Sequence, residues 1–181
     1  MLRFHYIRSP RVDGRAYGLS TPADDLIALC VTSPLDVESL RDLLVSSGHP
    51  AESTRVISRV FAFPSAPKNS ISFLLSRAGR HEALLGITDF VTYVNPNMGC
   101  TGSSYRASGW HLLGIEPGTK YRYLDNRYIT DRELEARFGK QDDETYKRIL
   151  GLRFAVSVMP LEPLLVFRTS LSSHVSPRLQ R

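Results

Sequence analysis

The sequence has few of the residues that build metal centres, disulfide frameworks or hydrolase triads. Its 181 residues include only two cysteines, Cys30 and Cys100, which lie far apart and form no metal or redox spacing. The five histidines show neither HxxH nor HxxxH spacing, and no Ser-His-Asp arrangement stands out. We therefore expect no metal site, and we expect Cys30 to be a core residue.

Long apolar segments are also missing. No stretch approaches the roughly 18 apolar residues that a membrane-spanning helix needs, and the N-terminus lacks the apolar core of a signal peptide. These two absences predict a cytoplasmic protein without a membrane partner. Residues 1–170 are expected to form a single domain, followed by a polar, basic and flexible tail over 171–181.

What is present is the composition of a globular protein with a basic charge balance. Hydrophobic residues make up 42% and charged residues 23% of the chain, which is enough to bury a core. The net charge is +5, and 13 of the 23 Lys and Arg lie in 101–181 against 9 of the 18 Asp and Glu. This excess permits an anionic partner such as nucleic acid or a phosphorylated cofactor, although an ordinary basic protein fits the charge equally well.

Hydrophobic periodicity and turn residues divide the chain into alternating strands and helices. Strands are predicted over 26–31, 54–63, 85–94, 110–115, 121–125, 153–158 and 164–169. Helices are predicted over 36–45, 69–80, 102–108 and 131–138, whereas 9–25 is predicted to be a loop. Asn69 or Ser70 is expected to cap the second of these helices, and Thr130 or Asp131 the last. This order predicts a mixed α/β or α+β fold with helices packed against one mixed sheet.

The segment from Asn95 to Trp110 is the strongest candidate for a site. It packs small residues, hydroxyls, Tyr105 and Arg106 into a turn that should open a short helix. Small residues let a ligand approach the backbone, and free amides at a helix start attract anions or polar acyl groups. Tyr105 is suited to donate a proton or to orient an amine, and it is equally suited to be a packed aromatic. Ser104 is a weak nucleophile unless a base lies near it.

Two further candidates lie earlier in the chain. Lys68, Asn69 and Ser70 follow a predicted strand and precede a predicted helix, which suits a phosphate or pyrophosphate; a plain loop with a capping residue is the alternative. Arg59 lies on the predicted strand 54–63, where period 2 puts it on one face with Arg55. A cation on a half-buried strand needs an anionic partner, so the alternative for Arg59 is a structural salt bridge.

Aromatic residues and arginines are interleaved in the second half of the sequence. Such a mixture suits a platform for nucleobases with contacts to phosphate, and it equally suits sheet aromatics with solvated arginines on the other face. The residues concerned are Tyr93, Tyr105, Trp110, Tyr121, Tyr123 and Tyr128, with Arg106, Arg122, Arg127 and Arg132.

Several segments, taken in order, resemble the phage Mom family of DNA adenine-modification proteins, a divergent branch of the GNAT acyltransferase fold. They are Val56–Phe63 with its central Arg, Asn69–Leu75 with Asn-x-x-Ser, Phe90–Pro96, Gly99–Trp110 and Arg153–Val156. The resemblance covers roughly residues 54–158. It implies a GNAT-like α+β fold with a central mixed sheet flanked by helices, in the cytoplasm of the host cell if the gene is carried by a phage.

The resemblance also implies an activity: transfer of an acyl-type group from acyl-CoA or acetyl-CoA to the N6 amine of adenine in double-stranded DNA. Two alternatives are a GNAT acyltransferase that acts on a small-molecule or protein amine, and a non-catalytic DNA-binding domain of the same fold. The implied catalytic residues are Arg59, Ser72, Asn95 (where the family usually has Asp) and Tyr105. The implied cofactor-binding residues are Lys68, Asn69 and Ser70, and the implied substrate-binding residues are Tyr93, Ser104, Arg106 and Trp110.

Overall fold

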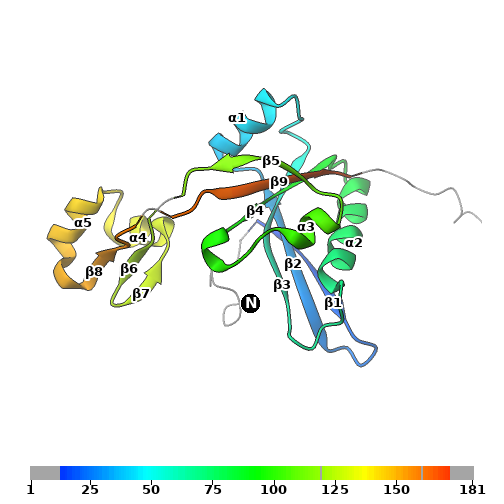
Figure 1. Ribbon diagram of the computed structural model, residues 1–181, viewed down its shortest axis with the longest axis horizontal. Coiled ribbons are helices and arrows are strands. Elements are labelled where there is room, and N and C mark those ends of the chain that lie inside the picture. Colours follow the sequence, from blue (N-terminus) through cyan, green and yellow to red (C-terminus); the bar gives the residue numbers. More distant parts are fainter. Residues whose placement is uncertain (1–12, 119, 160, 172–181) are drawn as a thin grey trace, which may run out of the picture. The chain divides into compact units, whose positions relative to one another are not determined.

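The computed structural model describes residues 13–118, 120–159 and 161–171, which form two compact units (Figure 1). Unit 1 comprises Met1–Val94, Cys100–Ile115 and Leu165–Arg181, and unit 2 comprises Asn95–Gly99 and Glu116–Leu164. The expected single domain over 1–170 stays a prediction. Apart from Leu171, the tail expected over 171–181 lies outside the described residues.

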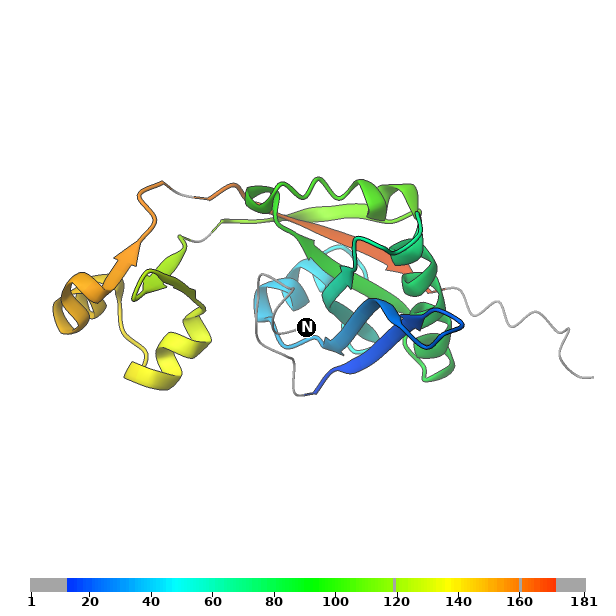
Figure 2. The same cartoon turned by 90° about the horizontal axis from the view of Figure 1, so that it is seen from below.

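Unit 1 is built on a mixed sheet of six strands in the order β1-β2-β3-β4-β9-β5. Strands β3 and β4 are parallel, whereas the β1–β2, β2–β3 and β4–β9 pairs are antiparallel, so the predicted mixed sheet is confirmed. Figure 2 shows β9 running between β4 and β5. The strands are β1 (Arg15–Ser20), β2 (Leu26–Pro34), β3 (Thr54–Ala62), β4 (Asp89–Val94), β5 (His111–Glu116) and β9 (Leu164–Ser170).

Strand β1 corrects the sequence-based prediction, which made 9–25 a loop. Arg15–Ser20 forms an edge strand whose residues alternate between half-buried and exposed. Tyr17 and Leu19 pack against the core at period 2, but Gly18 between them and the charged, Gly-rich and Pro-rich flanks hide this alternation in the sequence. The predicted strand 85–94 also starts late, since α2 continues to Leu84 and β4 begins at Asp89.

Helices cover both faces of the unit 1 sheet. Helix α2 (Ser70–Leu84) and the short α3 (Ser103–Ala107) pack on one face, and α1 (Glu38–Ser46) packs on the other. Neighbouring residues of one strand alternate between the faces: on β4, Phe90 belongs to the α2-side cluster and Val91 to the α1-side cluster. The α2-side cluster includes Ala28, Cys30, Ile57, Leu74, Leu75, Ala78, Phe90, Val94, Tyr105, Trp110 and Phe167.

Unit 2 has a smaller sheet and a core of its own. Strands β6 (Arg122–Leu124), β7 (Arg127–Ile129) and β8 (Phe154–Val156) form an antiparallel sheet with β6 in the middle. Helices α4 (Asp131–Phe138) and α5 (Asp143–Leu150) pack on one face, and short 3-10 turns occupy Pro96–Met98 and Gly151–Arg153. Its core comprises Leu124, Ile129, Leu134, Tyr146, Leu150 and Phe154.

The sequence predicted α4 with its correct bounds and missed β7 and α5. The Thr130 hydroxyl accepts a hydrogen bond from the Glu133 amide at 3.2 Å, which confirms the expected cap of α4. Asp142 caps α5 in the same way, accepting from the Thr145 amide at 2.7 Å.

Candidate functional site

The site begins where two parallel strands separate. Strand β3 continues to Ala62, but its pairing with β4 extends only from Thr54 to Ile57. The Thr92 hydroxyl donates to the Ile57 carbonyl at 3.2 Å at the end of the paired region. On the other side of β3, the register with β2 shifts, since Val31 faces Arg59 and Thr32 faces Ile57. Ser58 is therefore a bulged residue, and β3 bends away from β4 beyond it.

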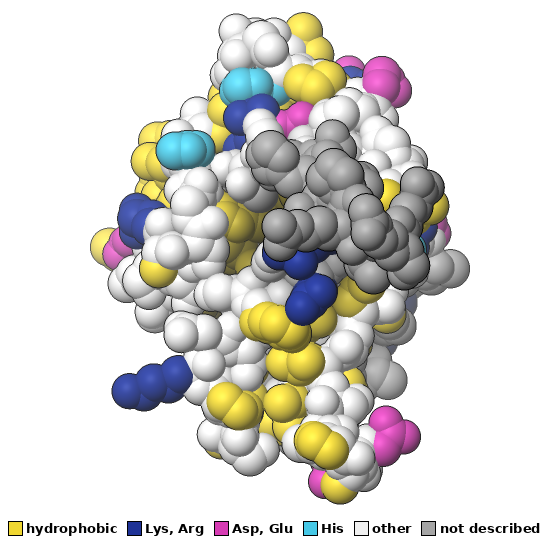
Figure 3. Space-filling model, turned by 90° about the vertical axis from the view of Figure 1, so that its right-hand side faces the viewer, with side chains coloured by type: hydrophobic (Ala, Val, Ile, Leu, Met, Phe, Trp, Pro, Cys, Tyr) yellow, Lys and Arg dark blue, Asp and Glu magenta, His cyan; other side chains and the backbone are white. Residues whose placement is uncertain are grey.

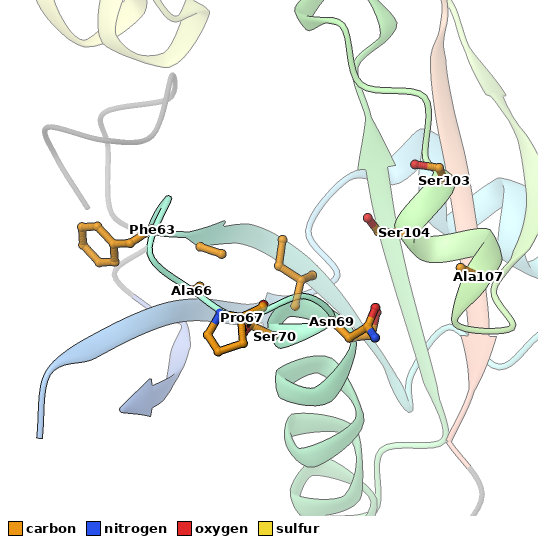
Figure 4. A pocket seen from close by; sticks show the side chains of 11 residues that line it. Phe63, Ala66, Pro67, Asn69, Ser70, Ser103, Ser104 and Ala107 are labelled. Carbon is orange, nitrogen blue, oxygen red and sulfur yellow. Dashed lines mark hydrogen bonds between the residues drawn. The ribbon is translucent and has the colours of Figure 1, made fainter. Parts of the chain in front are cut away.

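A pocket of about 340 Å³ lies beside the end of β3 (Figure 4). Its wall combines the end of β3 and the following loop, the first turn of α2, and one side of α3. The lining side chains are apolar or carry hydroxyl and amide groups: Ala62, Phe63, Ala66, Pro67, Asn69, Ser70, Ile71, Ser72, Ser103, Ser104 and Ala107. Figure 4 shows Ser103, Ser104 and Ala107 on α3 across the pocket from Asn69 and Ser70 at the start of α2.

The first turn of α2 contributes backbone donors to this pocket. Asn69 is the N-cap residue at φ 67°, and the helix that follows is 15 residues long. The Ser70 amide donates to the Pro67 carbonyl at 3.2 Å, and the Phe73 amide donates to the Asn69 carbonyl at 2.9 Å. Between them, the amides of Ile71 and Ser72 belong to the turn that has no intrahelical acceptor. The helix dipole adds partial positive charge at this end, so the turn favours an anion.

The two polar side chains at this turn have different surroundings. The Ser70 side chain is buried and its hydroxyl donates to the Pro67 carbonyl at 2.7 Å, which holds the loop against the helix. The Asn69 side chain makes no capping hydrogen bond, so the predicted role of Asn69 or Ser70 as a side-chain cap is wrong: Asn69 is in the left-handed region, unlike the extended backbone of most side-chain caps. Asn69 instead lines the pocket.

The outer surface of α2 next to the pocket is basic and apolar. The Arg77 guanidinium lies over the exposed Phe73 ring at 5.0 Å, and Arg80 is also exposed. Glu82 is the one acidic residue of the helix, and it is fully buried. Figure 3 shows this side of the molecule, where hydrophobic and basic side chains lie near one another. A surface of this kind attracts anions.

Arg59 does not lie where period 2 predicted. Because Ser58 is bulged, Val60 and Ala62 pack against the same α2-side cluster as Ile57, and Arg59 alternates with them to the other face. The expectation that Arg55 and Arg59 share a face is therefore wrong. Arg55 forms the structural salt bridge, with its Nε 3.5 Å from Glu82. Arg59 donates from Nη1 to the Ser58 carbonyl and is not among the pocket-lining residues.

Tyr105 and Trp110 lie in the core rather than in the pocket wall. The Tyr105 ring is edge-on to Trp110 with centroids 5.0 Å apart and stacked on Phe167 at 6.0 Å. Trp110 also stacks on Phe90 at 6.3 Å. Arg106 is exposed, donates to the Thr101 carbonyl at 2.6 Å and lies over the Phe167 ring at 5.0 Å. These contacts hold α3 against the sheet.

The remaining candidates divide between the pocket and other places. Ser72 and Ser104 line the pocket, whereas Lys68 is exposed and lies outside the lining. Tyr93 packs with the α1-side cluster, on the other face of the sheet. Asn95 belongs to unit 2, where its Oδ1 accepts from the Asn97 amide at 3.0 Å and its Nδ2 donates to the Tyr121 hydroxyl at 2.8 Å.

Sequence reasoning missed several pocket residues and one buried polar cluster. Ala62 and Phe63 line the pocket, and only their position at the end of a strand could have pointed to them. Ala66 and Ala107 also line it; both lie in segments that the sequence singled out, although neither was named as a site residue. The missed cluster is centred on Glu82, on the α2 face of the sheet. Its carboxylate accepts from Thr32 at 2.6 Å, from Tyr17 at 3.0 Å and from Arg15.

Two pKa values in unit 1 are displaced by burial. Burial raises the pKa of the Cys30 thiol to about 12, with the Glu82 charge as a second cause. Burial, the hydrogen bond to Glu82 and its charge raise the pKa of Tyr17 to about 12. Both groups are thus neutral near pH 7. Neither lines the pocket.

The described residues offer neither a cluster of metal ligands nor a helix that could span a membrane. Within 13–118, 120–159 and 161–171, no group of three or more His, Cys, Asp or Glu side chains is placed so that it could hold a metal ion. Among the helices in the same part of the chain, none has the length and apolar character needed to cross a membrane. The cytoplasmic location stays a prediction.

Comparison with known proteins finds likeness in structure alone. No protein-family model matches the chain, and no curated protein matches it in sequence. An N-acetyltransferase from Staphylococcus aureus Mu50 matches with a TM-score of 0.53 and 8% identity, over 93% of this chain and 82% of that one. A mutant spermidine N-acetyltransferase from Vibrio cholerae matches with a TM-score of 0.51 and 9% identity, over 92% and 69% of the two chains.

A Bacillus subtilis acetyltransferase in complex with CoA matches with a TM-score of 0.50 and 13% identity, over 88% of this chain and 78% of that one. Identities this low carry information about the fold only. The chain therefore has the mixed α+β fold of the GNAT acetyltransferases, as the resemblance implied.

Proposed function

We propose that the protein is an acyl-CoA-dependent acyltransferase that acts on an amine. The observation that carries the proposal is the pocket at the start of α2, where β3 bends away from its parallel neighbour β4. Helix-start amides, hydroxyls and apolar side chains meet there, which is the combination that a phosphorylated donor with an apolar arm requires. The GNAT fold supports the same assignment, since acetyltransferases share it.

In this proposal the donor supplies an acyl group activated as a thioester. The amine nitrogen attacks the carbonyl carbon, a C–N bond forms, the C–S bond breaks, and the thiolate takes up the proton that the nitrogen loses. The Ile71 and Ser72 amides bind the donor's pyrophosphate, with Asn69 and Ser70 beside them and Lys68 adding positive charge from the surface. The Ser72 and Ser104 hydroxyls orient the polar part of the donor.

Of the four residues to which the Mom resemblance assigns catalysis, Ser72 lines the pocket, where its amide and hydroxyl are proposed to hold the donor. Catalytic roles for Arg59, Asn95 and Tyr105 and substrate-binding roles for Tyr93, Arg106 and Trp110 rest on the Mom resemblance. Of these, Tyr105 and Trp110 are better supported as residues that hold α3, since both are buried in the aromatic stack.

The donor site is tested by isothermal titration of CoA into the full chain and its variants. Ser72→Glu puts a carboxylate in the pocket, and at about 5 Å from a pyrophosphate charge the repulsion is about 3 kcal/mol at an effective dielectric constant of about 20. We expect CoA binding to weaken by about 100-fold. The control is Ser76→Glu, one turn along on the exposed side of α2, where screening limits the change to about threefold. Wild-type protein that does not bind CoA would refute the proposal.

For the acceptor we propose a small-molecule amine first. The support is that a spermidine N-acetyltransferase is among the proteins of this fold. The assay supplies acetyl-CoA with a panel of mono- and polyamines and follows the release of free thiol. Release that depends on one amine class identifies the acceptor, and a panel without turnover contradicts this choice.

The second candidate acceptor is the N6 amine of adenine in double-stranded DNA, as the Mom resemblance implies. One observation favours it: the face of the unit 2 sheet opposite α4 and α5 carries Tyr123 and Tyr128 as a directly paired couple, with the Tyr121 ring 5.4 Å from that of Tyr128. Tyrosine rings on a sheet stack well on bases, at about 1–3 kcal/mol per base. Adenine in a duplex must leave the base stack to react, which costs a few kcal/mol that such stacking offsets.

Nucleoside mass spectrometry of DNA from cells with and without the gene tests this candidate. A modified adenine that depends on the gene supports it, and unmodified DNA together with turnover of a small amine refutes it. Salt-dependent DNA binding without CoA binding would instead favour the non-catalytic DNA-binding domain.

A further inference from the structure

Helix α3 forms one wall of the pocket, yet it is too short to hold its own position. It has five residues, and an isolated helix of that length has no stability in water. One side of the helix faces the pocket and the other faces the core. Ser103, Ser104 and Ala107 line the pocket, whereas Tyr105 is buried in the core. The position of the pocket-lining residues must therefore be determined by the contacts that the other side of α3 makes with the core.

Phe167 of β9 receives three of those contacts. The Tyr105 ring stacks on it at 6.0 Å, the Arg106 guanidinium lies over it at 5.0 Å, and Gly102 lies beside its edge with no room for a Cβ between them. Gly102 is buried at φ +72°, directly before the helix. A Cβ added at Gly102 would come within 2.7 Å of Phe167 Cε2 and 2.9 Å of Cζ, closer than such atoms approach in proteins. The start of α3 thus lies as close to Phe167 as a glycine allows.

We infer that Gly102 and Phe167 are positioning residues of the donor pocket: their contact sets the distance of the α3 wall from the start of α2, and with it the affinity for the donor. Neither residue lines the pocket, so neither is expected to touch the donor itself. Any side chain at position 102 displaces either α3 or the Phe167 ring, which lies in the core and is fully buried. The inference rests on the proposed function, because it needs a donor that binds in this pocket.

The chain offers a matched control at the other end of the same helix. Gly109 follows α3 at φ +79°, almost the same backbone conformation as Gly102, but an added Cβ there meets nothing within 4 Å. Gly102→Ala and Gly109→Ala therefore carry a similar backbone penalty for positive φ. They differ in the contact with Phe167. A role limited to stability would lower the thermal unfolding midpoint of both variants and leave donor affinity unchanged in both.

The experiment measures CoA affinity by calorimetry and the split between KM and kcat by thiol release, with the unfolding midpoint as a folding check. We expect Gly102→Ala to weaken CoA binding by about tenfold, with KM for acyl-CoA rising more than kcat falls, and Gly109→Ala to bind like wild type. Adding Phe167→Leu to Gly102→Ala makes room for the new methyl group and restores part of the affinity.

Folded Gly102→Ala protein with wild-type affinity would overturn the inference, as would equal losses in the two glycine variants. If Gly102→Ala does not fold, Phe167→Leu alone provides the test, because it removes the ring that supports Tyr105 and Arg106 and must weaken CoA binding. Failure of the wild-type chain to bind CoA would count against the proposed function. Wild-type binding together with unchanged variants would count against this inference alone.

Discussion

Glu82 carries a carboxylate whose loss should cost unit 1 a large part of its stability. Its side chain is fully buried, and it accepts hydrogen bonds from Thr32, Tyr17 and Arg15. It is also the ion-pair partner of Arg55, whose side chain is 15% exposed and whose Nη1 is buried without a hydrogen-bond partner among the described residues. The carboxylate thus joins β1, β2 and β3 to α2.

Glu82→Gln keeps the size of the side chain and removes its charge. Arg15 is 41% exposed and can turn towards water, but Arg55, whose side chain is only 15% exposed, is left without its carboxylate partner. Breaking a buried ion pair from one side costs about 3–5 kcal/mol, and because Arg15 can rehydrate we expect a value of about 3 kcal/mol. The control is Glu52→Gln. Glu52 is 87% exposed in its pair with Arg41, so this substitution should lower the free energy of unfolding by less than about 1 kcal/mol.

Urea unfolding followed by tryptophan fluorescence measures this cost. Trp110 is the only tryptophan of the chain and lies buried in unit 1, so its emission reports on the unit that contains Glu82. Equal unfolding midpoints for Glu82→Gln and Glu52→Gln would refute the reasoning, because they would show that Arg55 does not depend on the buried carboxylate.

Two further predictions follow from the displaced pKa values. Because the pKa of Tyr17 is raised to about 12 in the folded protein, the folded state keeps a proton that the unfolded state loses near pH 10, so stability falls as pH rises from about 10 to 12. Tyr17→Phe should flatten that fall in unfolding measurements, and an unchanged slope would contradict the assignment. Because Cys30 is buried with its pKa near 12 and Cys100 is exposed, Ellman's reagent should react with one thiol in the native chain and with two after unfolding. Prompt reaction of both thiols in the native chain would contradict this prediction, because it would show that the reagent reaches Cys30 in the α2-side core.

The sequence predicted the helices and strands whose hydrophobic pattern is strong, and missed those with little to bury. The predicted strand 54–63 matches β3 (Thr54–Ala62) closely, because Val56, Ile57 and Val60 pack in the two clusters. Helix α5 buries only Tyr146 and Leu150 among charged residues, so its apolar pattern is short and its capping residue, Asp142, was the better signal.

The candidate site was predicted in part, for physical reasons that differ between its residues. Asn69–Ser72 and Ser103–Ser104 come together because both segments begin helices that pack side by side on one face of the sheet. Arg59 was assigned to the wrong face because one bulged residue reverses the alternation, and period 2 cannot reveal a bulge. For Tyr105, the sequence shows only a tyrosine, and a tyrosine can serve either as a catalytic hydroxyl or as a ring packed in the core.

The place of β9 in the sheet has a consequence for how the chain acquires its structure during synthesis. β9 lies between β4 and β5, although β4 ends at Val94 and β9 starts only at Leu164. The sheet of unit 1 therefore stays incomplete until about residue 170 has left the ribosome. Most of unit 2 is one continuous segment, Glu116–Leu164, so its sheet and core can form as soon as that segment has been synthesised. Until β9 arrives, the edges of β4 and β5 are open to other strands, and this interval is when a chaperone would matter most.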